Sequence, residues 1–303
     1  MGQNRKPKNT ANKQRRRRKN AAVGRRRKRK ARRQSSQWKE KKRLDTAHLQ
    51  TLCERICQAE ALDATEILNE GRNRETVLEL ALNACSYLSD LVDRSYYKEK
   101  WMCSVGCNFC CRTTRIHVAP PEVLLIAEYL RASCAHEELD TVRDRIEHTA
   151  HQVSTMSEEE QTRARVPCAL LSQDGKCSVY EVRPIRCRAW CSLTKERCRE
   201  GFDTGSPTTT TQIDGYAYAM GIAVSEGLEY AVKHAGLDGE QYELHNSLLR
   251  ALFTENSAEL WIQGKESLFK DCLRGIRNGK PTLGDILQKN NPRANKTPPN
   301  NQP

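Results

Sequence analysis

The chain gathers its cysteines most densely in the stretch Cys103-Ser-Val-Gly-Cys107-Asn-Phe-Cys110-Cys111. A second stretch, farther along, carries Cys168, Cys177, Cys187 and Cys191. Thiolates two or three residues apart on a tight turn can bind one metal without stretching the backbone. A second group that the fold brings in can then complete a tetrahedral shell or hold a cluster. The sequence therefore predicts a metalloprotein.

The predicted metal ligands are the eight clustered cysteines: Cys103, Cys107, Cys110, Cys111, Cys168, Cys177, Cys187 and Cys191. Thiolate is a soft ligand that suits zinc, copper(I) or iron–sulfur chemistry rather than magnesium or calcium. Eight thiolates are enough for one four-ligand zinc site, for a site with two ions, or for an iron cluster such as 4Fe–4S. The pattern leaves the choice between zinc and iron open. Because Cys110 and Cys111 are adjacent, one of them can face a second metal, point into the core or remain a free thiol.

A cysteine can also be a small buried hydrophobic residue without any metal. We expect this of the cysteines outside the two clusters, which are Cys53, Cys57, Cys85, Cys134, Cys198 and Cys272. His117 follows the first cluster closely and is a candidate supplementary ligand.

Charge is distributed unevenly along the 303 residues. Residues 1–43 hold 21 Lys or Arg and a single acid, Glu40, so this segment carries about +20. The other 30 basic and 37 acidic residues leave the rest of the chain near −7. A segment so charged and so poor in apolar residues cannot bury enough surface to offset its ordering entropy. We expect residues 1–43 to form a disordered polybasic arm.

The arm contains the runs Arg15-Arg-Arg-Arg-Lys19 and Arg25-Arg-Arg-Lys-Arg-Lys30, with Trp38 as its only aromatic residue. Contiguous positive charge without interleaved aromatics suits attraction to a phosphate backbone without base readout. RNA or DNA is the expected partner. A nuclear-import signal, an anionic membrane surface and a solvated tail without a partner are the alternatives.

The chain shows no apolar run of the roughly 20 residues that a membrane span requires. The basic start lacks the apolar core of a signal peptide. We therefore expect a soluble, cytoplasmic protein, or a nuclear one in a eukaryote. In a reducing compartment, clustered cysteines favour metal over disulfides.

The expected fold class is mainly α, with helices around a small irregular cysteine-rich centre and disordered tails at both ends. Residues 44–203 should contain helices and the cysteine centre, and residues 204–212 read as a Ser/Thr/Gly/Pro linker. Residues 213–290 should be helical, and residues 291–303 should form a disordered tail. Within this scheme, Ile116-His-Val118 suits a short strand and Pro120-Pro121 suits a helix start. Asp174-Gly175 indicates a hairpin turn.

Beyond these local signals, the cysteine pattern resembles that of a known family. The first cluster, followed by Gly-Lys-Cys177-Ser-Val-Tyr180-Glu-Val-Arg183-Pro184-Ile-Arg-Cys187-Arg188, is similar to the YkgJ-type cysteine-cluster proteins, which include the flagellin lysine N-methylases. The resemblance covers roughly residues 100–192. Cys103 lies one residue farther out than in the family pattern, and Val166-Pro167 precedes Cys168 where the family has a Pro after the cysteine. The resemblance implies a domain that chelates zinc or iron.

Two enzyme hypotheses accompany this reading. Resemblance to the methylases implies S-adenosylmethionine-dependent lysine N-methylation of a protein substrate. The spacing Cys103-x₃-Cys107-x-Phe109-Cys110 also resembles the cluster loop of radical S-adenosylmethionine enzymes, but the chain lacks the βαβ alternation of their barrel.

Arg183 and Arg188 can offset thiolate charge or can pair with an acid such as Glu181. The non-enzyme hypothesis is a structural metal in a module that binds nucleic acid through its arm.

Overall fold

The computed structural model describes residues 47–94, 99, 101–104, 106–205, 213–264 and 268–275. The predicted arm, nearly all of the predicted linker and the predicted C-terminal tail lie outside these residues. The chain divides into two units, Met1–Thr51 and Leu52–Pro303. In the first unit, residues 47–51 are helical. All the elements discussed below belong to the second unit.

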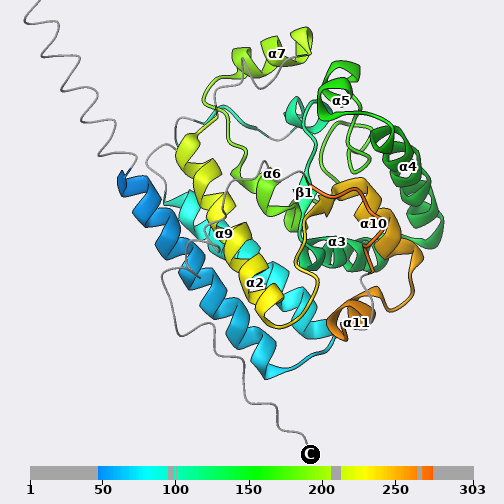
Figure 1. The fold of residues 1–303 in the computed structure, drawn as a ribbon. Helices are drawn as coiled ribbons and strands as arrows, with labels where there is room; N and C mark the ends of the chain where they lie inside the picture. Colours follow the sequence, from blue (N-terminus) through cyan, green and yellow to red (C-terminus); the bar gives the residue numbers. More distant parts are fainter. Residues whose placement is uncertain are drawn as a thin grey trace, which may run out of the picture. The chain divides into compact units, whose positions relative to one another are not determined.

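The described part of the second unit is mainly helical, which confirms that part of the predicted fold class (Figure 1). After a helix over residues 52–70, the helices are α2 (Arg74–Asp93), α3 (Pro120–Ser133), α4 (His136–Ser154), α5 (Glu158–Ala164), α6 (Ile185–Ala189), α7 (Lys195–Thr204), α9 (Gly215–His234), α10 (Leu244–Phe253) and α11 (Ser257–Ile262). Short 3-10 helices form at η2 (Cys110–Arg112) and η3 (Tyr180–Val182).

Local signals set several helix starts. The Asn73 side chain accepts a hydrogen bond from Thr76 N–H at the start of α2. Pro120 and Pro121 occupy the first turn of α3, as predicted, where their fixed φ suits the helix. The Asp214 carboxylate accepts hydrogen bonds from the first turn of α9. Such caps satisfy N–H groups that have no partner within a helix.

The core forms where α2 packs against α3, α6 and α9, and where α10 packs against α3 and α4 (Figure 1). Leu80 and Leu88 of α2, Leu124 and Ile126 of α3 and Leu228 of α9 are completely or almost completely buried. Elements from residues 213–264 thus pack directly against elements from residues 74–189. Among the described residues, no helix is long and apolar enough to cross a membrane.

Two short strands that are far apart in the sequence pair with each other. β1 (His117–Val118) pairs with β2 (Tyr242–Glu243) in antiparallel register, with His117 opposite Glu243. The first strand follows the prediction. The second lies in a region that the sequence predicts to be helical. It is a strand because the Gly236–Gly239 segment interrupts the helix, and β1 then supplies hydrogen-bond partners for the extended backbone. This sheet brings the start of α10 to the segment that follows the first cysteine cluster.

Candidate metal centre

The first cysteine cluster folds as a tight turn followed by η2. Gly106 takes a left-handed φ of 83°, and Cys107 N–H donates to Ser104 O at 2.9 Å. Only glycine adopts this φ at little cost, so Gly106 allows the turn. Thr114 N–H then donates to Cys110 O at 3.0 Å, which closes the turn around Cys110 and Cys111.

The second cluster begins on a hairpin, as the Asp174-Gly175 signal predicts. Leu171 and Cys177 form an antiparallel bridge, and Gly175 takes a φ of 77°. The Asn108 side chain donates to Gly175 O at 3.1 Å. Cys168 N–H donates to Cys111 O at 2.7 Å. These two hydrogen bonds link the two clusters, one through the Asn108 side chain and one between backbone atoms.

The remaining cysteines lie on α6 and just after it. Glu122, a buried residue of α3, accepts hydrogen bonds from Ile185 N–H and Ala119 N–H, each at 2.8 Å. This carboxylate therefore ties the start of α6, which carries Cys187, to the start of α3. Beyond α6, Cys191 O accepts a hydrogen bond of 2.8 Å from Asp214 N–H.

All eight predicted ligands line one cavity of about 720 Å³. Its apolar wall includes Leu88, Val92, Trp101, Ile116, Val166, Leu170, Val179, Trp190 and Leu244. The fold thus brings together two cysteine clusters that are well separated in the sequence. None of the fourteen cysteines forms a disulfide. The cavity is therefore bordered by free thiols.

Burial and mutual proximity raise the pKa of several of these thiols. Burial raises the pKa of Cys187 well above the usual value, and the nearby thiol of Cys168 adds to the effect. Burial also raises the pKa of Cys191 to about 12. For Cys110, the hydrogen bond with Cys111 is the largest cause of a raised pKa, and burial follows. A bound cation reverses this preference, because a coordinating thiol loses its proton.

Among the described residues, no group of three or more Cys, His, Asp or Glu side chains is placed so that it could hold a metal ion. The eight thiols share a cavity without being drawn together around one point. The eight cysteines thus line one cavity, and the predicted metal-binding centre stays a prediction.

Arg183 and Arg188 of the second cluster have different roles. Arg188 donates to Arg183 O at 2.9 Å, to Glu181 O and to Ser89 Oγ at 3.2 Å, so it braces the turn before α6. The Arg183 guanidinium lies 4.2 Å from the centre of the Tyr180 ring, and its buried Nε has no hydrogen-bond partner. Both side chains line the cavity. Arg183 is therefore the one with a donor left for an anion.

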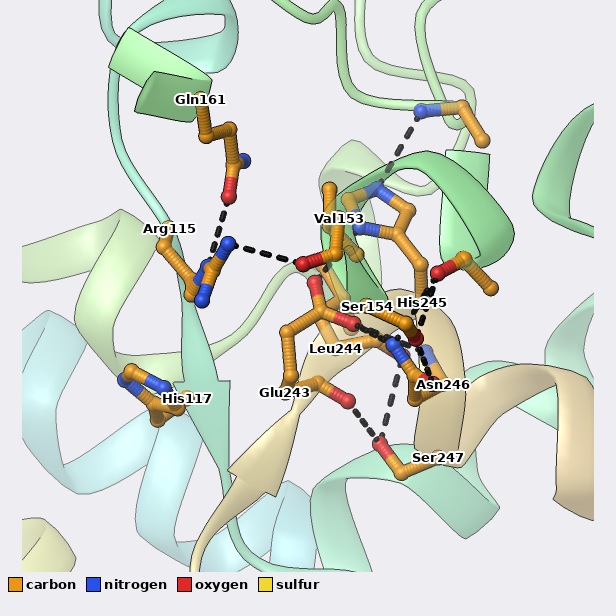
Figure 2. A network of polar contacts seen from close by, with 12 residues as sticks. Arg115, His117, Val153, Ser154, Gln161, Glu243, Leu244, His245, Asn246 and Ser247 are labelled. Atoms are coloured by element: carbon orange, nitrogen blue, oxygen red, sulfur yellow. Dashed lines mark hydrogen bonds and ion pairs between the residues drawn. The ribbon is translucent and has the colours of Figure 1, made fainter. Parts of the chain in front are cut away.

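A buried polar network supports the wall near Cys168 (Figure 2). Glu243 and His245 are buried, and Glu243 Oε1 lies 2.7 Å from His245 Nδ1. Burial alone opposes ionisation of Glu243, but the charge of His245 and hydrogen bonds from His245 and Asn246 lower its pKa to about 2. His245 Nε2 lies 3.3 Å from the Ala169 backbone nitrogen. The network thus fixes the Cys168–Ala169 segment against α10.

A search against known protein families, curated proteins and solved structures finds no match to this chain. The resemblance to the YkgJ-type proteins accordingly stays a prediction from the cysteine motif.

Sequence reasoning missed two side chains that belong to this neighbourhood. His245 lines the cavity, whereas the predicted supplementary ligand His117 does not. The Nε2 atom of His117 lies 3.8 Å from Glu158 Oε1 instead. Cys198 lies close enough to Cys107 and Cys110 for their charges to raise its pKa, after the larger effect of burial. It is partly exposed, unlike the buried Cys53, Cys57 and Cys85. The sequence carries no local signal for the position of Cys198, because this residue reaches the first cluster only through the fold.

Proposed function

We propose that the cavity binds a soft metal, zinc or iron, through cysteine thiolates. The observation that carries this proposal is the gathering of all eight clustered cysteines around one cavity of about 720 Å³. Thiolates in this number suit zinc or iron–sulfur chemistry. The family resemblance of the cysteine motif supports the same choice of metals.

Metal binding in this cavity would require the thiols to move closer together. A tetrahedral zinc site has Zn–S bonds of about 2.3 Å, which puts its sulfur atoms about 3.8 Å apart. The thiols therefore move toward one another as they lose their protons to solvent and gain the metal. Arg183 is placed to offset part of the resulting negative charge, because its Nε has no other partner.

The metal content of the full-length protein, purified without oxygen, tests the proposal. We expect stoichiometric zinc or iron, and an absorption spectrum separates a colourless zinc protein from a brown iron–sulfur protein with labile sulfide. Cys177→Ser and Cys187→Ser should lose metal. Cys134→Ser is the matched control, because Cys134 is partly exposed and outside the cavity lining. Full metal retention in both cluster variants contradicts the proposal.

The charge of residues 1–43 supports a second role, which is attachment to nucleic acid or another polyanion. An arm of about +20 joined to a remainder near −7 draws a polyanion to the arm. If the arm neutralises about six to ten phosphates, affinity should fall by about 10³–10⁵ between 50 and 200 mM salt.

Deletion of residues 1–43 tests this role. The shortened protein should lose binding to RNA and DNA and keep its metal. Tight binding by the shortened protein, insensitive to salt, would locate the nucleic-acid surface on the remaining chain.

A further inference from the structure

The cavity lined by the eight cysteines is far larger than a metal ion needs. Its volume is about 720 Å³, within the range of roughly 300–1,000 Å³ that small-molecule pockets occupy. A zinc ion with Zn–S bonds of about 2.3 Å takes up only a small part of such a space. Much of the lining besides the cysteines is apolar and comes from α2, from the segment before α6 and from the start of α10. The cavity therefore has room for an organic molecule.

Two indole rings form part of this apolar wall, and residues that do not line the cavity hold both of them in place. Trp101 Nε1 donates to Asp214 Oδ2 at 3.0 Å, and Asp214 also caps the start of α9. The Trp190 ring packs edge-on against the Tyr218 ring, with 5.6 Å between the ring centres. Because these contacts fix the indoles in advance, a flat apolar molecule can bind against them at a lower entropy cost.

The charge of the cavity wall favours an anionic ligand. Among the lining residues in the described part of the chain, the one carboxylate, Asp93, is outnumbered by three cations, Lys176, Arg183 and Arg188. Lys176 Nζ pairs with Asp174 Oδ2 at 2.6 Å, and Arg188 makes the hydrogen bonds that brace the turn before α6. Arg183 is the cation that remains for a ligand.

The Arg183 side chain makes no hydrogen bond or ion pair within the described residues, and its Nε is buried without a partner. Its guanidinium carbon lies 4.2 Å from the centre of the Tyr180 ring, which is half exposed. A guanidinium has five N–H donors in one plane, so it can pair with a carboxylate through two of them and still face a thiolate. An anion bound here would stabilise a partly buried charge that otherwise has no partner.

We propose that the cavity binds a small carboxylic acid with a flat apolar ring system. Its carboxylate pairs with Arg183, and its rings lie against Trp101 and Trp190. This inference goes beyond the proposed metal-binding function and does not depend on it, because neither the guanidinium nor the indoles belong to the proposed metal ligands.

Isothermal titration calorimetry with 2-naphthoate and 2-naphthamide tests the inference on the full-length protein, purified without oxygen. The two probes share one ring system and differ in the charge of the head group. The wild type should bind one naphthoate per chain and should bind naphthamide about tenfold or more weakly, because the amide carries no charge to pair with Arg183. Arg183→Gln should bind both probes alike, with the affinity that the wild type has for naphthamide. Trp101→Leu should weaken both probes by a similar factor, because the ring contact is common to both.

Arg197→Gln is the matched control, because Arg197 is an exposed arginine outside the cavity lining, and it should bind both probes like the wild type. Circular dichroism checks that Arg183→Gln folds, as expected for a side chain without hydrogen bonds. If the wild type binds no naphthoate or binds both probes equally, or if Arg183→Gln keeps the preference for the acid, the inference is wrong. Metal analysis of the same samples tests the proposed metal-binding function separately, so the two failures can be told apart.

Discussion

Glu60 offers a sharp test of how the packing around the helix over residues 52–70 affects stability. Its side chain is 0% exposed, and both carboxylate oxygens are buried without a hydrogen-bond partner. The helix packs closely against α9, as shown by a Cβ added to Gly227 of α9, which would lie 2.8 Å from the Glu60 Cβ. Burial, with a smaller contribution from Asp63, raises the pKa of Glu60 to about 8.

The raised pKa makes the folded state lose stability as pH rises. Below pH 4.5, the ordinary pKa of Glu, the carboxyl is protonated in both the folded and the unfolded chain, and burial costs no ionisation energy. Between that pH and about 8 the unfolded chain ionises while the folded one keeps its proton. At about 1.4 kcal/mol per pH unit, the loss accumulates to an upper value of about 5 kcal/mol.

Urea unfolding of the wild type and of Glu60→Gln at pH 5, 6, 7 and 8 measures this loss. The amide is neutral throughout, so Glu60→Gln should be nearly as stable as the wild type at pH 5 and several kcal/mol more stable at pH 8. Glu66→Gln, at an exposed position of the same helix, is the matched control and should follow the wild-type profile. A difference between the wild type and Glu60→Gln that stays constant with pH would refute the reasoning.

Three further predictions concern the surroundings of the cavity. Glu122→Ala should destabilise the fold by about 2–4 kcal/mol in urea unfolding and weaken metal binding, because Ile185 N–H and Ala119 N–H lose their buried acceptor. Gly221→Ala should lower the free energy of unfolding by about 1–3 kcal/mol, because the added Cβ would lie 2.3 Å from the Ala189 Cβ. At Gly215 an added Cβ meets nothing within 4 Å, so Gly215→Ala should be tolerated. Glu243→Gln should cost up to about 3 kcal/mol above pH 5, because the pKa of Glu243 is lowered to about 2 and its contribution disappears only as pH falls from 4.5 toward that value. For Glu243→Gln, an equal cost at pH 3 and pH 7 would contradict this account.

Much of the helical fold follows from short-range signals in the sequence. The Pro120-Pro121 start of α3 and the Asp174-Gly175 turn both appear where local backbone preferences place them. These features depend on φ restrictions and on hydrogen bonds between residues a few positions apart. A reader of the sequence can therefore locate them without knowing the tertiary structure.

The candidate metal ligands could be predicted from the sequence, because the spacing of the cysteines within each cluster is local. Their meeting around one cavity could not, nor could the positions of His245 and Cys198 beside them or the absence of His117 from the lining. It also decided that Glu60 is buried without a partner while Glu66 on the same helix is exposed. These outcomes depend on contacts between distant segments, such as α7 on η2 and β1 on β2. Such contacts arise from packing over the whole core, and no local periodicity or spacing encodes them.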